Sequence, residues 1–113
     1  MTDIKLTKES EYVLTAMYKE FLDRYNQGVP RDKCKTFGHQ VNILKLVPEI
    51  PEQDIYGLLS ELARCEVINV SPGANIFMLV SINTNGIIYM ENKLGKDVSK
   101  IVNWLLKTKS LFI

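Results

Sequence analysis

The fold is decided by residues 36–80, which read TFGHQVNILKLVPEIPEQDIYGLLSELARCEVINVSPGANIFMLV. Two series of apolar side chains recur in this stretch at helical spacing, on either side of the break Pro48-Glu49-Ile50-Pro51. The first series is Phe37, Val41, Leu44 and Val47, and the second is Ile55, Leu58, Leu59 and Leu62. We therefore expect a helix-turn-helix at about residues 36–65, with Thr36 capping its first helix and Pro51 in the first turn of its second.

Two runs rich in β-branched and apolar residues follow, at residues 67–70 and 76–80. Between them lies Ser71-Pro72-Gly73-Ala74-Asn75, in which proline and glycine favour a reversal of the chain. The pattern predicts a two-stranded hairpin, or wing, at about residues 67–80.

Helical spacing recurs on both sides of this core. A first helix is expected at about residues 7–27, with Thr7 as its cap. Its apolar face comprises Val13, Leu14, Met17, Phe21, Leu22 and Tyr25. Further helices are expected at about residues 84–109, with a break at Leu94-Gly95. The inner face of the last helix comprises Val98, Ile101, Val102 and Leu105. The chain thus reads as a single domain of the α+β class.

Composition places the chain among ordinary globular proteins. Its 113 residues are 46% hydrophobic and 24% charged, enough to bury one core without a disulfide or a metal. Cys34 and Cys65 stand 31 positions apart with no CxxC motif or histidine-rich companion, so we expect neither a disulfide nor a metal site. Met1 to Lys5 lacks a signal-peptide core, and no apolar run approaches the roughly 20 residues that cross a bilayer. A cytoplasmic location, no membrane contact and no cofactor are expected.

The overall charge of +1 conceals an uneven distribution. Residues 31–45 carry four basic side chains against Asp32, a net charge of +3. Residues 46–92 carry six acidic side chains against Arg64, a net charge of −5, and residues 93–113 carry five lysines against Asp97, a net charge of +4. A nucleic-acid partner would therefore have to bind the first or the last of these segments.

Catalytic chemistry has little support in the sequence. His39 is the only histidine and has no acidic neighbour to orient it, so a polar position on a helix surface is expected. Cys34 lies between Lys33 and Lys35, which favour a thiolate, but an ordinary loop cysteine is the simpler interpretation. We expect a protein that is not an enzyme.

The order of a first helix, a helix-turn-helix and a wing resembles the winged-helix family over about residues 7–94. The resemblance implies that the helix after Pro51 reads the major groove of DNA. The face opposite its apolar series carries Gln53, Gly57, Ser60 and Arg64, with Tyr56 on one flank.

The predicted DNA interface consists of two sets of residues. Gln53, Tyr56, Ser60 and Arg64 would face the duplex, and Arg31, Lys33, Lys35 and Lys45 would bind phosphates. Three carboxylates, on Glu52, Asp54 and Glu61, lie on the same helix, and residues 71–75 contain no Lys or Arg. These features oppose the usual docking on DNA.

The C-terminal segment suggests a second kind of contact. Trp104 lies off the inner stripe of the last helix, and the sequence closes with Leu111-Phe112-Ile113. Such side chains favour a dimer or a partner interface, because aromatic and apolar anchors supply most of the energy of such contacts. Packing of the last helix onto the first within one chain is the alternative.

Two functions are thus open. The first is a small bacterial-type DNA-binding transcriptional regulator, expected to bind double-stranded DNA as a homodimer. The alternative is an adaptor in a DNA replication or other nucleic-acid machine, including one carried by a mobile element. In that case the acidic helix or the segment from Trp104 to Ile113 would bind a protein partner. Catalysis through Cys34 or His39 is a distant third.

Overall fold

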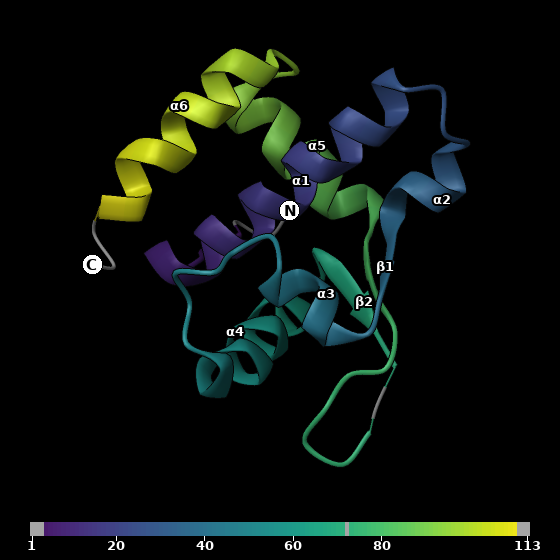
Figure 1. The fold of residues 1–113 in the computed structure, drawn as a ribbon, viewed down its shortest axis with the longest axis vertical. Helices are drawn as coiled ribbons and strands as arrows, with labels where there is room; N and C mark the ends of the chain where they lie inside the picture. The colour runs from purple at the N-terminus through teal and green to yellow at the C-terminus, as the bar shows by residue number, and fades with distance from the viewer. Residues whose placement is uncertain (1–3, 72, 111–113) are drawn as a thin grey trace.

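A computed structural model of the chain describes residues 4–71 and 73–110. In this part of the chain, six helices and a three-stranded antiparallel sheet make an α+β fold (Figure 1). The elements in chain order are α1 (Lys8–Asn26), α2 (Arg31–Lys35), β1 (Thr36–Gly38), α3 (Gln40–Leu44), α4 (Glu52–Arg64), β2 (Ile68–Val70), β3 (Val80–Ile82), α5 (Thr84–Leu94) and α6 (Val98–Lys109).

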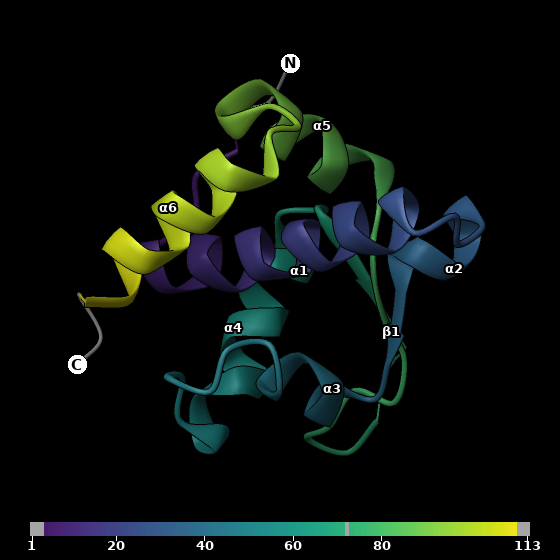
Figure 2. The same ribbon diagram turned by 45° about the horizontal axis from the view of Figure 1, so that its top comes forward.

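Helix α1 is the central element of the fold. It runs between α5 and α6 on one side and α3 and α4 on the other, as two views show (Figures 1 and 2). Thr7 caps it as expected, since its hydroxyl oxygen accepts from the backbone N–H of Ser10 at 3.2 Å. Residues 10–18 are all buried, so the helix is enclosed on every side rather than on the one face expected. Tyr25, which we expected on that face, is 55% exposed.

The first half of the predicted helix-turn-helix is wrong in its boundaries. Residues 31–35 form helix α2 where a linker was expected, and Thr36 begins a strand instead of capping a helix. Gly38 has a φ of +77°, a left-handed conformation that ends this strand and suits glycine. The cap of α3 is His39, whose Nδ1 accepts from the backbone N–H of Val41 at 3.0 Å.

This shift also changes which side chains α3 buries. Ile43 is fully buried, whereas Val41, which we placed on the apolar face, is 43% exposed. Phe37 is buried as expected, but from strand β1. The expected apolar series, from Phe37 to Val47, needs about three helical turns at 3.6 residues per turn. Helix α3 has only five residues, so it cannot contain that series.

Helix α4 follows the prediction closely. It starts after Pro51 and ends at Arg64, and its expected inward residues, Ile55, Leu58, Leu59 and Leu62, are all buried. Pro51 is the N-cap of α4 and not part of its first turn as expected, but the strong period of 3.6 located the helix.

The sheet has the strand order β1-β3-β2, and its third strand, β1, was not expected. Strand β2 pairs with β3 from Ile68 opposite Ile82 to Val70 opposite Val80. The second wing strand, expected at residues 76–80, instead begins at Val80. The reason is that the backbone N–H and carbonyl of Phe77 both form hydrogen bonds with Gln40, so they are not available for pairing with β2. Gln40 Oε1 accepts from the N–H of Phe77 at 2.9 Å, and the Gln40 N–H donates to the Phe77 carbonyl at 3.0 Å.

The two C-terminal helices lie where the sequence placed them. Asn83 caps α5 by accepting from the N–H of Gly86 at 3.0 Å, and Asp97 caps α6 by accepting from the N–H of Ser99 at 3.0 Å. Of the four inner residues expected on α6, only Ile101 is fully buried, because α6 covers α1 with one side and leaves the other partly open. Thr108 is also buried there.

Candidate functional site

The predicted phosphate-binding residues do not form one cluster with α4. Arg31, Lys33 and Lys35 lie on α2, and α2 and α4 stand on opposite sides of the molecule in both views (Figures 1 and 2). The guanidinium of Arg31 lies over the ring of Phe21, 5.6 Å from its centroid. Lys45 follows α3 and lines a separate groove against α1 and α6.

The outward face of α4 is only partly available. Gln53, Gly57 and Arg64 are exposed, as the sequence predicted. Ser60 is half-buried, and its hydroxyl donates to the carbonyl of Tyr56 at 2.8 Å. Tyr56 is half-buried as well, and other contacts hold its ring in place.

The ring of Tyr56 stacks on Phe77, with 4.6 Å between the ring centroids. This contact joins α4 to the loop between β2 and β3. The exposed neighbours of Gln53 on α4 are the carboxylates of Glu52 and Asp54. The face that the family resemblance directs toward DNA thus presents more negative than positive charge.

Cys34 and His39 have structural partners. Cys34 is fully buried in α2, not in a loop as we expected, and its thiol donates to the carbonyl of Val29 at 3.2 Å. His39 caps α3 and is not on the helix surface. Among the described residues there is no group of histidine, cysteine, aspartate or glutamate side chains that could hold a metal. Nor does any helix in those ranges have the length and apolar character to cross a membrane.

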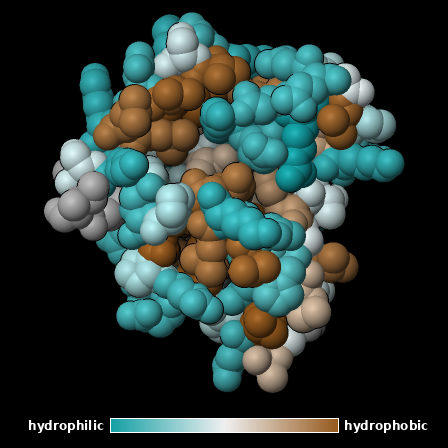
Figure 3. All heavy atoms as spheres, in the orientation of Figure 1, coloured by the Kyte–Doolittle hydropathy of each residue, from teal (hydrophilic) through white to brown (hydrophobic). Residues whose placement is uncertain are grey.

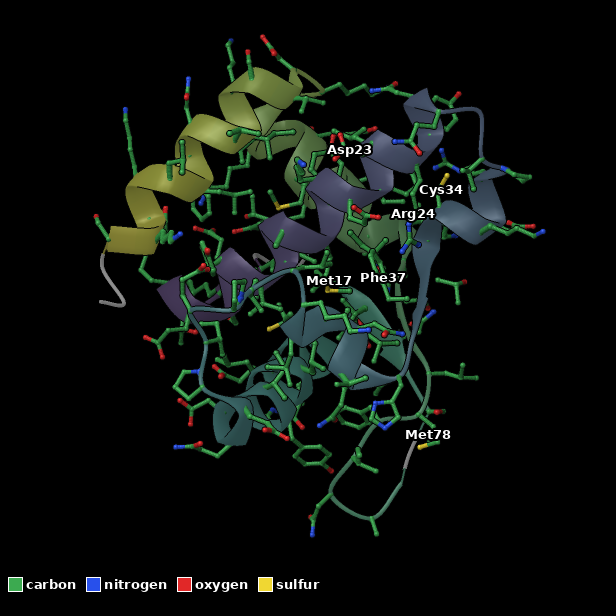
Figure 4. All side chains as sticks on the ribbon, in the orientation of Figure 1. Met17, Asp23, Arg24, Cys34, Phe37 and Met78 are labelled. Carbon is green, nitrogen blue, oxygen red and sulfur yellow. The ribbon has the colours of Figure 1, made fainter. Side chains whose placement is uncertain are left out.

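Arg24 is a structural residue that the sequence did not single out. Its Nη1 donates to the carbonyls of Thr36 at 2.8 Å and Lys33 at 3.2 Å, and its Nε pairs with Glu20 at 3.0 Å. The guanidinium also lies 4.8 Å from the centroid of the Phe37 ring. Figure 4 shows Arg24 between α1, α2 and β1, near Cys34 and Phe37. It fixes α2 against α1.

The described residues contain an open groove between α1, α6 and the segment that joins α3 to α4, which we call the α1–α6 groove. Its volume is about 370 Å³. Its apolar lining comprises Tyr12, Ala16, Leu46, Val102, Leu105 and Leu106. Its charged lining comprises Lys19, Glu20, Lys45, Glu49 and Lys109. Figure 3 shows apolar surface on α6 and near the centre of the face, with a hollow and hydrophilic side chains between them.

Most charges around the α1–α6 groove have a partner of opposite sign. Lys19 pairs with Asp23 at 2.7 Å, Glu20 pairs with Arg24, and Lys109 Nζ lies 3.4 Å from Glu49 Oε2. The hydroxyl of Tyr12 donates to the other oxygen of Glu49, and burial together with this carboxylate raises the pKa of Tyr12. Among the described residues, Lys45 has no ion pair, so the groove keeps one uncompensated positive charge.

The structure describes Trp104 of the predicted C-terminal interface but not its last three residues. Trp104 is half-buried and packs against the protein's own core, with Lys93 Nζ 5.7 Å from its ring centroid. Helix α6 packs on α1 in the same chain, which was the alternative to an intermolecular contact. Leu111, Phe112 and Ile113 lie outside the described residues.

Leu106 is one of the groove residues that the sequence reasoning missed. It is 61% exposed on α6, beside the inner stripe rather than within it. Residues 102, 105, 106 and 109 follow the spacing i, i+3, i+4 and i+7, which is that of a helix face in contact with a neighbour. The signal was present, but the sequence could not show that α1 covers only part of this face.

Comparisons with known proteins add no relative: no protein-family model, no curated protein and no solved structure matches this chain. The candidate sites therefore rest on the geometry described above.

Proposed function

We propose that this chain is a non-enzymatic, protein-binding adaptor that takes an apolar segment of a partner into the α1–α6 groove. The observation that carries the proposal is the groove itself. Its volume of about 370 Å³ lies within the range of ligand sites, and Leu106 at its edge is 61% exposed. A concave site that is lined mainly by apolar side chains and has a few charged groups at its rim is typical of binding sites.

The arrangement of elements also supports a winged-helix type of module. The order α1, β1, α3, α4, β2, β3 and the strand order β1-β3-β2 are compatible with a winged-helix-like arrangement, with the short helix α2 inserted before β1. A fold of this kind can serve more than one function, so the choice between protein and DNA depends on the surface chemistry.

Duplex DNA binding through α4 is the second candidate. The observation in its favour is the exposed row of Gln53, Gly57 and Arg64, since glutamine and arginine suit base edges and glycine allows close approach. Against it are the carboxylates beside Gln53, the absence of Lys and Arg from residues 71–75, and the position of the α2 cations across the molecule. The balance favours a protein partner.

Two titrations of the ¹⁵N-labelled full chain, followed by NMR, distinguish these functions. One ligand is a synthetic amphipathic peptide helix with leucine on its apolar face. The other is a mixed-sequence duplex of about 20 base pairs at about 50 mM salt, a condition that favours phosphate contacts. We expect the peptide to shift the amide signals of Ala16, Lys45 and Leu106.

A matched pair of variants sharpens the test. Leu106→Glu should abolish peptide binding, whereas Ile88→Glu, at a residue of α5 that is 48% exposed, should leave it unchanged. Saturable binding of the duplex with shifts at Gln53 and Arg64, and no response to the peptide, would reject the adaptor in favour of the second candidate.

A further inference from the structure

We infer that the occupant of the α1–α6 groove is an amphipathic helix that carries acidic side chains beside its apolar face. This inference rests on the proposed protein-binding function and specifies the chemistry of the partner. It follows from the shape of the groove and from the charges at its rim.

The shape of the groove suits a helix. Two of its walls are the helices α1 and α6, and the α6 wall presents Val102, Leu105 and Leu106 at spacings of three and four residues. Rows of side chains at these spacings form ridges into which another helix packs its own side chains. The small side chain of Ala16, on α1, leaves space between the flanking residues for a large apolar anchor. Binding of an amphipathic helix in a groove between helices is a recurrent mode of recognition.

The charge of the groove favours an acidic occupant. Lys45 has no ion pair among the described residues, while the other charged lining residues are paired. Helix α6 contains no acidic residue, so it adds no carboxylate that would oppose an acidic partner. A partner with carboxylates beside its apolar face would be attracted, and a basic helix would be repelled.

A second copy of this chain fits less well. Pairing two copies of the groove across a twofold axis would bring together two patches that each carry Lys45, which has no ion pair in the described part of the chain, since such an interface presents the same patch on both sides. Like charges placed together oppose association. The charge of the groove therefore favours a different, acidic partner over a homodimer formed through this groove.

Three synthetic peptides of about 16 residues, long enough for four helical turns, test the inference by fluorescence anisotropy. All have leucine at the apolar positions of a heptad repeat, and the remaining positions are mainly Glu, Gln or Lys. With the full chain we expect the Glu peptide to bind most tightly and the Lys peptide most weakly. The preference should weaken at high salt, because the rim charges are exposed to solvent.

Variants of the chain locate the effect. Lys45→Glu should weaken binding of the Glu peptide by about fivefold, the upper range for an exposed charge pair. Lys33→Glu makes the same charge change on α2, outside the groove, and should have little effect. Leu106→Glu should remove binding of all three peptides, and Leu106→Met should retain it.

The results test the protein-binding function and the acidic character of the occupant separately. Equal affinity for the three peptides, or an equal effect of Lys33→Glu and Lys45→Glu, would overturn the acidic occupant and leave the adaptor function standing. No binding of any peptide would overturn both. A dimer in sedimentation that Leu106→Glu converts to monomer would show that a second copy occupies the groove, and would overturn the inference of a foreign acidic helix.

Discussion

Replacing Lys93 by Met should destabilise the fold more than the same replacement of any other lysine that forms an ion pair among the described residues. Glu11 on α1 is 5% exposed, and its Oε2 accepts from the Tyr89 hydroxyl at 2.6 Å and pairs with the ammonium of Lys93. Lys93 in turn lies over the ring of Trp104 on α6. One buried carboxylate therefore links α1, α5 and α6.

The expected loss in the free energy of unfolding is about 2 kcal/mol at neutral pH. Removing one partner of a fully buried ion pair costs about 3–5 kcal/mol, because the remaining charge is left without compensation. Here the Lys93 side chain is 33% exposed, so water near Glu11 reduces the loss. Tyr89→Phe, which leaves the ion pair in place, should cost about 1.5 kcal/mol, the lower end of the range for a hydrogen bond to a charged group.

The pH dependence identifies the cause of that loss. Burial raises the pKa of Glu11, but hydrogen bonds from Lys93 and Tyr89 and the positive charge of Lys93 outweigh it, so the pKa is lowered below its ordinary value of 4.5. A lowered folded pKa stabilises the native protein above pH 4.5, and this contribution is lost as the pH falls through the folded pKa. Without Lys93, burial dominates, the pKa should rise, and the variant should favour protonated Glu11.

The assay is urea unfolding followed by circular dichroism, for the parent chain and for Lys93→Met, at about pH 7 and about pH 5. The difference in the free energy of unfolding between the two proteins should be smaller at about pH 5. At that pH Glu11 of the variant is more readily protonated, and a neutral carboxyl group costs less to bury than an unpaired carboxylate. Lys19→Met is the matched control, because the side chain of its partner Asp23 keeps 28% exposure to water, and it should change stability by less than about 0.5 kcal/mol at either pH. A loss for Lys93→Met that is equally small, or that does not depend on pH, would refute the reasoning.

The other predictions concern packing and are measured by the same unfolding assay. Ile43→Ala should cost about 2–5 kcal/mol because Ile43 is fully buried, whereas Val41→Ala should change stability by less than about 0.5 kcal/mol because Val41 is largely exposed. A larger loss for Val41→Ala than for Ile43→Ala would mean that α3 has the orientation expected from the sequence. Gly86→Ala should cost about 1–3 kcal/mol, since a Cβ there would lie 2.2 Å from the carbonyl oxygen of Val67. Gly57→Ala, at an exposed position of α4 with no atom within 4 Å of the added Cβ, should instead stabilise by about 0.5–1 kcal/mol. A loss of stability in Gly57→Ala would indicate that the added Cβ contacts other atoms on this face of α4.

The long elements could be predicted from the sequence because each carries its own periodic signal. Helix α4 combines four inward apolar residues at the right spacing with a proline before its first turn, and both features are local. Helices α1, α5 and α6 have the same kind of evidence in Thr7, Asn83 and Asp97, which are good capping residues at the correct positions.

The short elements could not be predicted, because distant residues determine them. Strand β1 has three residues and α3 has five, too few to establish a period. The bonds that define them connect Gln40 with Phe77 and Thr36 with the strand opposite, more than 35 positions away. Nothing in the sequence indicates that Gln40 forms hydrogen bonds with the backbone of Phe77. The apolar run 76–80 was therefore interpreted as a strand over its whole length.

The candidate site was predictable only in its parts. Trp104 and the α6 stripe drew attention to the last helix, but the α1–α6 groove needs three segments brought together, and Ala16 and Lys45 have no special pattern around them. Likewise, the basic residues of segment 31–45 looked like one patch because they are close in sequence. Lys45 and the α2 cations face different neighbours once the chain has folded.

The attachment of Phe77 has a practical consequence for labelling the protein. Gln40 and Tyr56 hold this residue from two sides, so the connection between β2 and β3 is fastened partway along its length. Because loop-closure entropy grows only with the logarithm of loop length, a few added residues add little to the cost of closing the part of the connection that precedes Phe77. Residues 73–75 are exposed and lie before it. They are the natural place for a fluorophore or an epitope tag that must leave both the sheet and the groove undisturbed.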